Sequence, residues 1–175
     1  TVSVQDVEAA RIALKGVARE TPLRPARWLA EKVGGPVELK CENLQRAGSF
    51  KIRGAYTRMV RLSEEERARG VVAASAGNHA QGVALAASML GISATVFMPV
   101  GAPLPKVAAT RGYGAEIRFI GTAIDECLVA AQEFAHVQDA VARTDGGAGP
   151  RIAAAVATFC TRALRAGRFA YALLV

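Results

Sequence analysis

The stretch VVAASAGNHAQGVALAASMLGISATVFMPV, residues 71–100, decides the class of fold. It contains two short apolar runs, Val71–Ala74 and Ala94–Met98, each with the length of a buried strand. Between them, Asn78–Leu90 is long enough for a helix, and Gly91 is a residue type that ends helices. A strand, a helix and a second strand in this order predict two parallel strands joined by a crossover helix.

The same alternation continues on both sides of this stretch. On the C-terminal side we expect a helix at Leu104–Arg111, a strand at Glu116–Ile120, and a helix capped by Thr122 with Asp125 at the matching position, ending near Ala135. On the N-terminal side we expect helices at Lys51–Leu62 and Glu64–Arg69. Apolar strands that are each followed by a helix predict an α/β fold, with an open, mostly parallel twisted sheet and helices on both faces.

The first 45 residues show a looser pattern. We expect a helix capped by Ser3 and Asp6 that ends near Val17, an extended turn at residues 21–23, a short helix around Trp28 ended by Gly34, and a strand at Val37–Cys41.

Composition and charge exclude several classes of function. The net charge is +7, but the basic residues are dispersed, and the densest stretch, residues 58–69, is interrupted by three glutamates. No aromatic residues alternate with these cations, so we predict a solvated helix face and no nucleic-acid partner. The uncharged stretch from residue 80 to 105 is divided at Gly91 into a helix and a strand, which predicts no membrane span. Three widely spaced cysteines predict no metal site and a reduced, cytoplasmic protein.

Two segments contain residue types suited to chemistry. In AGSFKIRGA, residues 47–55, Lys51 lies at the predicted start of a helix, where the positive end of the helix dipole favours the neutral amine that attacks an aldehyde. In SAGNHAQG, residues 75–82, small residues link a strand to a helix, so backbone N–H groups form a cradle for a carboxylate or phosphate. Taken singly, each segment has a structural alternative. The first could be a surface lysine at a helix start, and the second a capped helix start.

Together, the two segments resemble the fold-type II pyridoxal-phosphate (PLP) enzymes, and among them the serine/threonine dehydratases, or threonine ammonia-lyases. The stretches TPL at 21–23 and LKCENLQ at 39–45 support the resemblance, which covers about residues 7–135. It implies that residues 1–45 belong to the N-terminal part of a large PLP domain and residues 46–135 to a small α/β domain. Residues 136–175 form a divergent tail, and the large domain is incomplete.

The resemblance also implies roles for individual residues. Lys51 matches the lysine that binds the PLP aldehyde covalently, and Phe50 matches the aromatic residue beside the ring. Asn78 matches the asparagine that hydrogen-bonds the phenolic oxygen of the ring. The matches to the loop that holds the substrate carboxylate are Ser75, Gly77 and His79. For His79, the alternative is a purely structural role at the start of the helix.

The implied reaction is the deamination of L-threonine, or of L-serine, by α,β-elimination. A serine racemase-like enzyme is an alternative, but relatives of that kind carry a second serine where this chain has Ala76, and alanine cannot exchange a proton. The implied partner is a small amino-acid substrate, with a homo-oligomer as a further expectation. A role in isoleucine biosynthesis and a catabolic role both stay open.

The last 40 residues differ in character from the rest. They contain 11 Ala and 5 Arg but neither Lys nor Glu, whereas the first 135 contain 5 Lys and 11 Glu. Gly146–Gly149 follows a polar stretch and is not predicted to replace the glycine-rich phosphate loop of the family. We therefore expect a truncated chain, with a shifted reading frame near residue 135 as one hypothesis. A catalytically inactive fragment that binds an amino acid or a subunit is the non-enzymatic alternative.

Overall fold

The computed structural model describes the backbone of residues 2–144 and the side chains of residues 2–136. The predictions for the tail beyond Thr144, including Gly146–Gly149, lie outside the described residues. The elements, in chain order, are α1 (Val4–Ala13), β1 (Leu23–Pro25), α2 (Arg27–Val33), β2 (Glu38–Lys40), the 3-10 turns η1 (Glu42–Leu44) and η2 (Arg46–Gly48), α3 (Lys51–Met59), α4 (Glu64–Arg69), β3 (Val71–Ala74), α5 (Asn78–Leu90), β4 (Ala94–Met98), α6 (Leu104–Gly112), β5 (Glu116–Phe119) and α7 (Ile124–Thr144).

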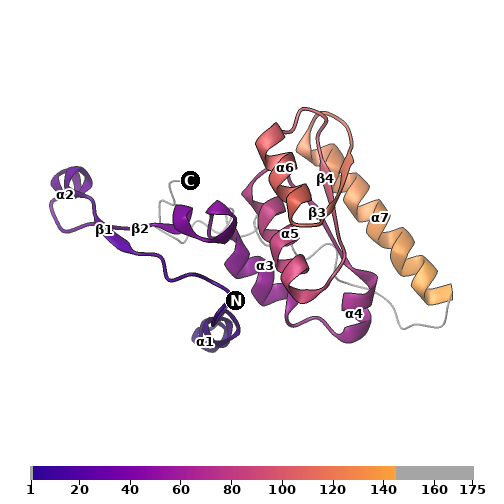
Figure 1. Cartoon of the computed structure of the whole chain (residues 1–175), viewed down its shortest axis with the longest axis horizontal. Coiled ribbons are helices and arrows are strands. Elements are labelled where there is room, and N and C mark those ends of the chain that lie inside the picture. The colour runs from indigo at the N-terminus through magenta and orange to yellow at the C-terminus, as the bar shows by residue number, and fades with distance from the viewer. Residues whose placement is uncertain (1, 145–175) are drawn as a thin grey trace.

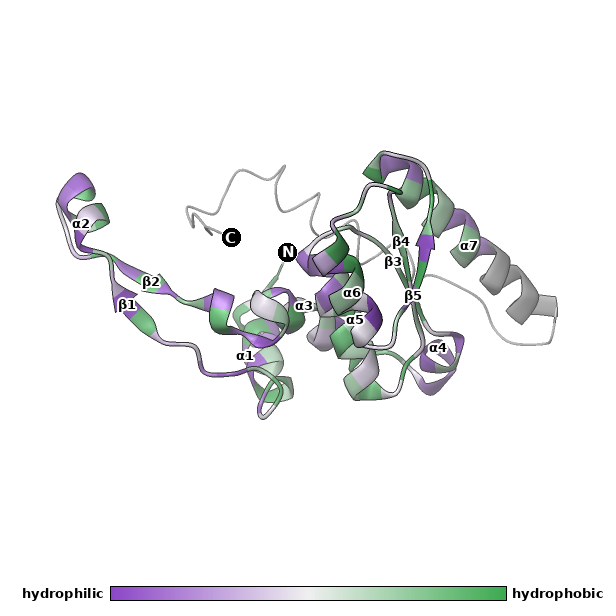
Figure 2. Ribbon diagram, turned by 45° about the horizontal axis from the view of Figure 1, so that its top comes forward, coloured by the Kyte–Doolittle hydropathy of each residue, from purple (hydrophilic) through white to green (hydrophobic). Residues whose placement is uncertain are grey.

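The predicted parallel sheet is present. Its strands lie in the order β3-β4-β5, and both pairs are parallel, with Val72 opposite Thr95 and Val96 opposite Ile117. Helices α5 and α6 cover one face and α7 covers the other, as Figures 1 and 2 show from two directions. The α/β class and the two covered faces are therefore confirmed.

The alternation of side chains along β4 divides the core into two clusters. Val96 and Met98 point to the face covered by α5 and α6 and are completely buried there. Phe97, between them in sequence, points to the other face and packs on Cys127 of α7. Phe97 and Phe134 also form a tilted ring pair with centroids 5.7 Å apart. One strand with apolar residues on both faces thus joins two helix layers.

The N-terminal segment projects from this unit as a separate arm (Figure 1). Strands β1 and β2 pair antiparallel, with Arg24 opposite Leu39, and every residue in them is exposed. The predicted helix around Trp28 is α2, and Gly34 ends it in the left-handed conformation, at φ +73°.

Three predicted helix boundaries are wrong. Helix α1 has the predicted capping box of Ser3 and Asp6, but it ends at Ala13, because the chain then turns through Gly16 at φ +77°. Helix α3 ends at Met59 and not at residue 62.

The third wrong boundary is that of α7, which begins at Ile124 and continues to Thr144. Thr122 and Asp125 do not cap this helix as predicted. Instead, the Glu126 carboxylate accepts hydrogen bonds from the backbone N–H groups of Thr122 and Ala123, at 2.8 and 2.9 Å. These two bonds hold the pKa of Glu126 below its ordinary value.

Candidate active site

Lys51 is the first residue of α3, and the turn before it directs the chain into that helix. Ala47 and Gly48 both have positive φ, at +59° and +66°, which reverses the chain in η2. The buried Ser49 then accepts a hydrogen bond from the Lys51 backbone N–H at 3.4 Å. The Lys51 ammonium lies 4.7 Å from the centre of the Phe50 ring, within the range of a cation–π contact. Lys51 and Phe50, both predicted to bind the cofactor, are therefore in contact with each other.

The second predicted segment follows β3 at its carboxyl end. The Ser75 backbone N–H donates to the Phe97 carbonyl and so extends the pairing with β4, and the Ser75 hydroxyl accepts from the Gly77 N–H at 3.2 Å. Asn78 and His79 then form the first turn of α5. Their position at the carboxyl ends of parallel strands is the position at which such sheets bind ligands.

Gly82 brings the two segments together. A Cβ atom added at Gly82 would lie 2.9 Å from the Lys51 Cβ and 3.0 Å from the Lys51 carbonyl carbon. The start of α3 therefore packs directly against the backbone of α5, one turn after Asn78. This close approach brings the two predicted segments, residues 47–55 and 75–82, together, although Lys51 and Asn78 are 27 positions apart in sequence.

His79 is a neutral imidazole at neutral pH. Its burial, and then the nearby Lys51 ammonium, lower its pKa from 6.5 to about 4. Its Nε2 atom is buried and has no hydrogen-bond partner. A neutral ring cannot attract a carboxylate by charge, so any such role would depend on a hydrogen bond from a buried nitrogen.

Lys106 is a member of this site that the sequence did not reveal. It lies in the first turn of α6, and its Nζ donates to the Oδ1 of Asn78 at 2.5 Å. Helix α6 follows β4 just as α5 follows β3, so both helices begin at the same edge of the sheet. That topology is the signal that could have marked Lys106 as a candidate.

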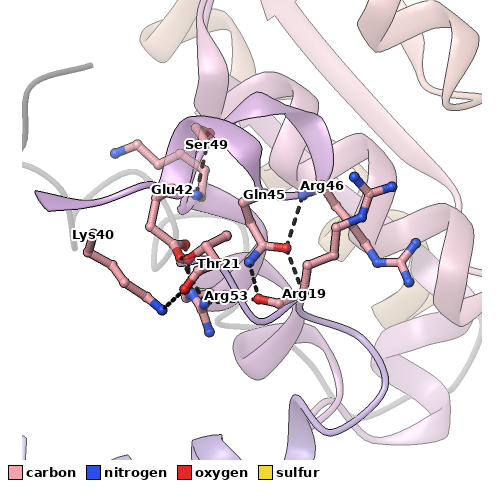
Figure 3. Close-up of polar contacts among 9 residues, drawn as sticks. Arg19, Thr21, Lys40, Glu42, Gln45, Arg46, Ser49 and Arg53 are labelled. Carbon is pink, nitrogen blue, oxygen red and sulfur yellow. Dashed lines mark hydrogen bonds and ion pairs between the residues drawn. The ribbon is translucent and has the colours of Figure 1, made fainter. Parts of the chain in front are cut away.

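A polar network, also not predicted, fastens the N-terminal arm to α3 (Figure 3). Glu42 accepts from Arg53 Nε at 2.7 Å and Nη2 at 2.8 Å, and from the Thr21 hydroxyl at 2.5 Å. The Lys40 ammonium donates to the Thr21 carbonyl. The hydrogen bonds from Arg53 are the main reason that the pKa of Glu42 lies below its ordinary value. Because Arg53 is two residues after Lys51, this network holds the helix that carries the lysine.

Gln45 forms a second set of hydrogen bonds, which join two parts of the N-terminal segment, residues 19 and 45–46. Its buried amide accepts from the backbone N–H groups of Arg19 and Arg46 and donates to the Arg19 carbonyl, each at 2.9 Å. Beside it lies an open hollow of about 570 Å³, and three of its lining residues, Arg19, Arg46 and Lys106, are basic. The remaining lining residues are Gln45, Ala47, Gly48, Gln81, Leu85 and Tyr113.

The donors of the site suit part of a PLP molecule. Lys51 supplies an amine for an aldehyde, and the Asn78 amide can donate to a phenolic oxygen. Gly77 has open space where a Cβ would stand, so the loop before α5 presents accessible backbone to an anionic group.

Within residues 2–136, no group of three or more His, Cys, Asp or Glu side chains is arranged to hold a metal ion. Among the described helices, none is long and apolar enough to cross a membrane.

The fold and this lysine–asparagine site define an α/β protein with an amine placed for carbonyl chemistry at the edge of a parallel sheet. Residues 14–164 match the family described as "Pyridoxal-phosphate dependent enzyme", and the chain belongs to that family. Its cofactor is therefore pyridoxal 5'-phosphate. The predicted resemblance is confirmed, although the family match continues beyond residue 135, where the resemblance was expected to end.

Individual relatives agree with this assignment. An L-threonine ammonia-lyase of Thermotoga maritima is 54% identical over 130 residues, which cover 74% of this chain and 32% of that protein. The structure of the processed form of threonine deaminase isoform 2 from Solanum lycopersicum superposes with a TM-score of 0.70 at 40% identity, over 77% of this chain and 37% of that one. Serine racemase from Dictyostelium discoideum superposes with a TM-score of 0.71 at 31% identity, over 78% and 45%. The chain thus spans about a third of the length of the Thermotoga relative.

Proposed function

We propose that this chain is part of a threonine ammonia-lyase that converts L-threonine to 2-oxobutyrate and ammonia, and L-serine to pyruvate. The observation that carries the proposal is the contact of the Lys51 helix start with α5 at Gly82, one turn after Asn78. The Thermotoga relative, named as an L-threonine ammonia-lyase, supports threonine as the substrate. A cytoplasmic location and a homo-oligomer belong to the same proposal.

The residues of the site have distinct roles in this proposal. Lys51 would hold the cofactor through its amine, and its free amine would serve as the general base that takes the α-proton of the substrate. PLP supplies an electron sink for the electron pair that this proton leaves behind. Asn78 would donate to the phenolic oxygen of the cofactor, and Phe50 would pack beside its ring. Ser75, Gly77 and His79, with the backbone amides of their loop, hold the substrate carboxylate.

A serine racemase-like activity is the second candidate, and the Dictyostelium structure is its support. Racemisation needs an acid or base on each face of the α-carbon, whereas elimination needs only one. Ala76 occupies the loop between Ser75 and Gly77, and its methyl group cannot exchange a proton. This residue favours elimination over racemisation.

Covalent trapping tests the proposal. The purified 175-residue chain is incubated with PLP, reduced with borohydride and digested, and the modified peptide is located by mass. We expect one major adduct at Lys51, which is absent from Lys51→Ala and unchanged in Lys15→Ala, a control at an exposed lysine outside the site. Scattered labelling of many lysines would instead support the inactive-fragment alternative. Turnover of threonine to 2-oxobutyrate, measured on the same preparation, then separates elimination from racemisation.

A further inference from the structure

The Asn78 side chain has a partner that determines which end of its amide is free to donate. A lysine ammonium has three donors and no acceptor, so Lys106 can bond only to the carbonyl end of the amide. The opposite orientation would place two donors face to face. With Oδ1 held at 2.5 Å by Lys106, the Nδ2 donor is the end directed away from it.

Lys106 occupies a position that a cation would not otherwise favour. It lies in the first turn of α6, which contains no acidic residue, and the positive end of the helix dipole repels a cation there. The side chain is partly buried, which adds a desolvation cost. The Asn78 carbonyl, 28 residues away in the chain, provides the acceptor that compensates for both effects.

We propose that Lys106 is a positioning residue, which orients Asn78 so that its Nδ2 donates to the phenolic oxygen of PLP. This inference rests on the proposed function, because it gives a purpose to the orientation of Asn78. Lys106 acts through Asn78 and does not itself touch the cofactor or the substrate. The ammonium also polarises the amide, which strengthens the Nδ2–H groups as donors.

The orientation is tested first without the cofactor. In the 15N-labelled chain, the side-chain amide signals of Asn78 are assigned by their loss in Asn78→Ala. We expect these signals to shift in Lys106→Met, to stay near their original positions in Lys106→Arg, and to be unaffected in Lys15→Met, a control at an exposed lysine. If the signals are unchanged in Lys106→Met, the inference is overturned, whatever the cofactor does.

The effect on the cofactor is measured by titrating PLP against absorbance. We expect Lys106→Met to weaken PLP binding about tenfold, as for the loss of a charge-assisted hydrogen bond, and Lys106→Arg to restore most of the affinity. In an Asn78→Ala background, Lys106→Met should have no further effect, because the two residues act in series. Additive losses in the double variant would contradict the inference. If the unmodified chain binds no PLP, the proposed function fails for this chain, and the amide signals alone decide whether Lys106 orients Asn78.

Discussion

Replacing Gly82 by alanine is expected to disturb the contact on which the site depends. The added Cβ would lie 2.9 Å from the Lys51 Cβ, 3.0 Å from the Lys51 carbonyl carbon and 3.2 Å from the Ile52 backbone nitrogen. Two of these three atoms are backbone, and none is at the end of a flexible side chain. The start of α3 must therefore move, and Lys51 must move with it.

The magnitude follows from two opposing effects. Overpacking costs about 1–3 kcal/mol, and the backbone contacts place this substitution near the upper end. Alanine is a better helix former than glycine by about 1 kcal/mol, which offsets part of that cost. We expect a net destabilisation of about 2 kcal/mol, equivalent to a decrease in Tm of about 4–8 °C for a chain of this size.

Gly54 offers a matched control within the helix on the other side of the contact. It is an exposed glycine inside α3, and a Cβ added there would meet nothing within 4 Å. Gly54→Ala should therefore stabilise the chain by about 0.5–1 kcal/mol through helix propensity alone. Thermal unfolding followed by circular dichroism measures both variants, and borohydride trapping at Lys51 should fall only in Gly82→Ala. If Gly82→Ala is as stabilising as Gly54→Ala, the close approach of α3 and α5 is refuted.

Three further predictions concern other contacts. The pKa of His79 is about 4 in the folded chain and 6.5 in the unfolded chain. The free energy of unfolding should therefore have its full contribution from neutral His79 above pH 6.5, and that contribution should be lost as the pH falls from 6.5 through 4. Urea unfolding at several pH values measures this slope, which His79→Gln should flatten; an unchanged slope would show that His79 is not the group responsible. Glu42→Gln should destabilise the chain by about 1–3 kcal/mol by weakening the Arg53 bonds, whereas Glu8→Gln, at an exposed ion pair, should cost under about 0.5 kcal/mol in the same urea assay. Equal effects would mean that the arm is not fastened through Glu42. Phe134→Leu should cost about 0.5–1.5 kcal/mol by removing the ring pair with Phe97, and a neutral result in the same assay would show that this pair does not contribute to stability.

The α/β unit was predicted more accurately than the arm, for a physical reason. Strands β3 and β4 and helix α5 have the predicted limits because each is a distinct, largely apolar run bounded by glycine, proline or polar residues. The end of α1 was misplaced because residues 14–17 continue the apolar pattern, while the left-handed Gly16 terminates the helix. The cap of α7 was assigned to the wrong residues because Glu126, one position after the expected partner, supplies the capping carboxylate.

The residues predicted for the site lie next to one another in sequence motifs, whereas those that were missed act across long separations. Phe50 and Lys51 are neighbours, as are Asn78 and His79, so a local pattern is sufficient to select them. By contrast, the Glu42–Arg53 pair depends on the folding of the arm against α3. No spacing in the sequence indicates which of the many charged side chains will meet.

Lys106 shows that part of this long-range information is still available from topology. A parallel sheet places the carboxyl ends of β3 and β4 side by side, so the helices that follow them, α5 and α6, must begin close together. A long cationic side chain in the first turn of α6 can then reach the first turn of α5, where Asn78 presents the acceptor. Once the order of the strands is known, the sequence therefore indicates where such a contact can form. The length and charge of the side chain then indicate which partner it can reach. For parallel sheets, the first turn of each helix that follows a neighbouring strand belongs in the search for site residues, even where no motif marks it.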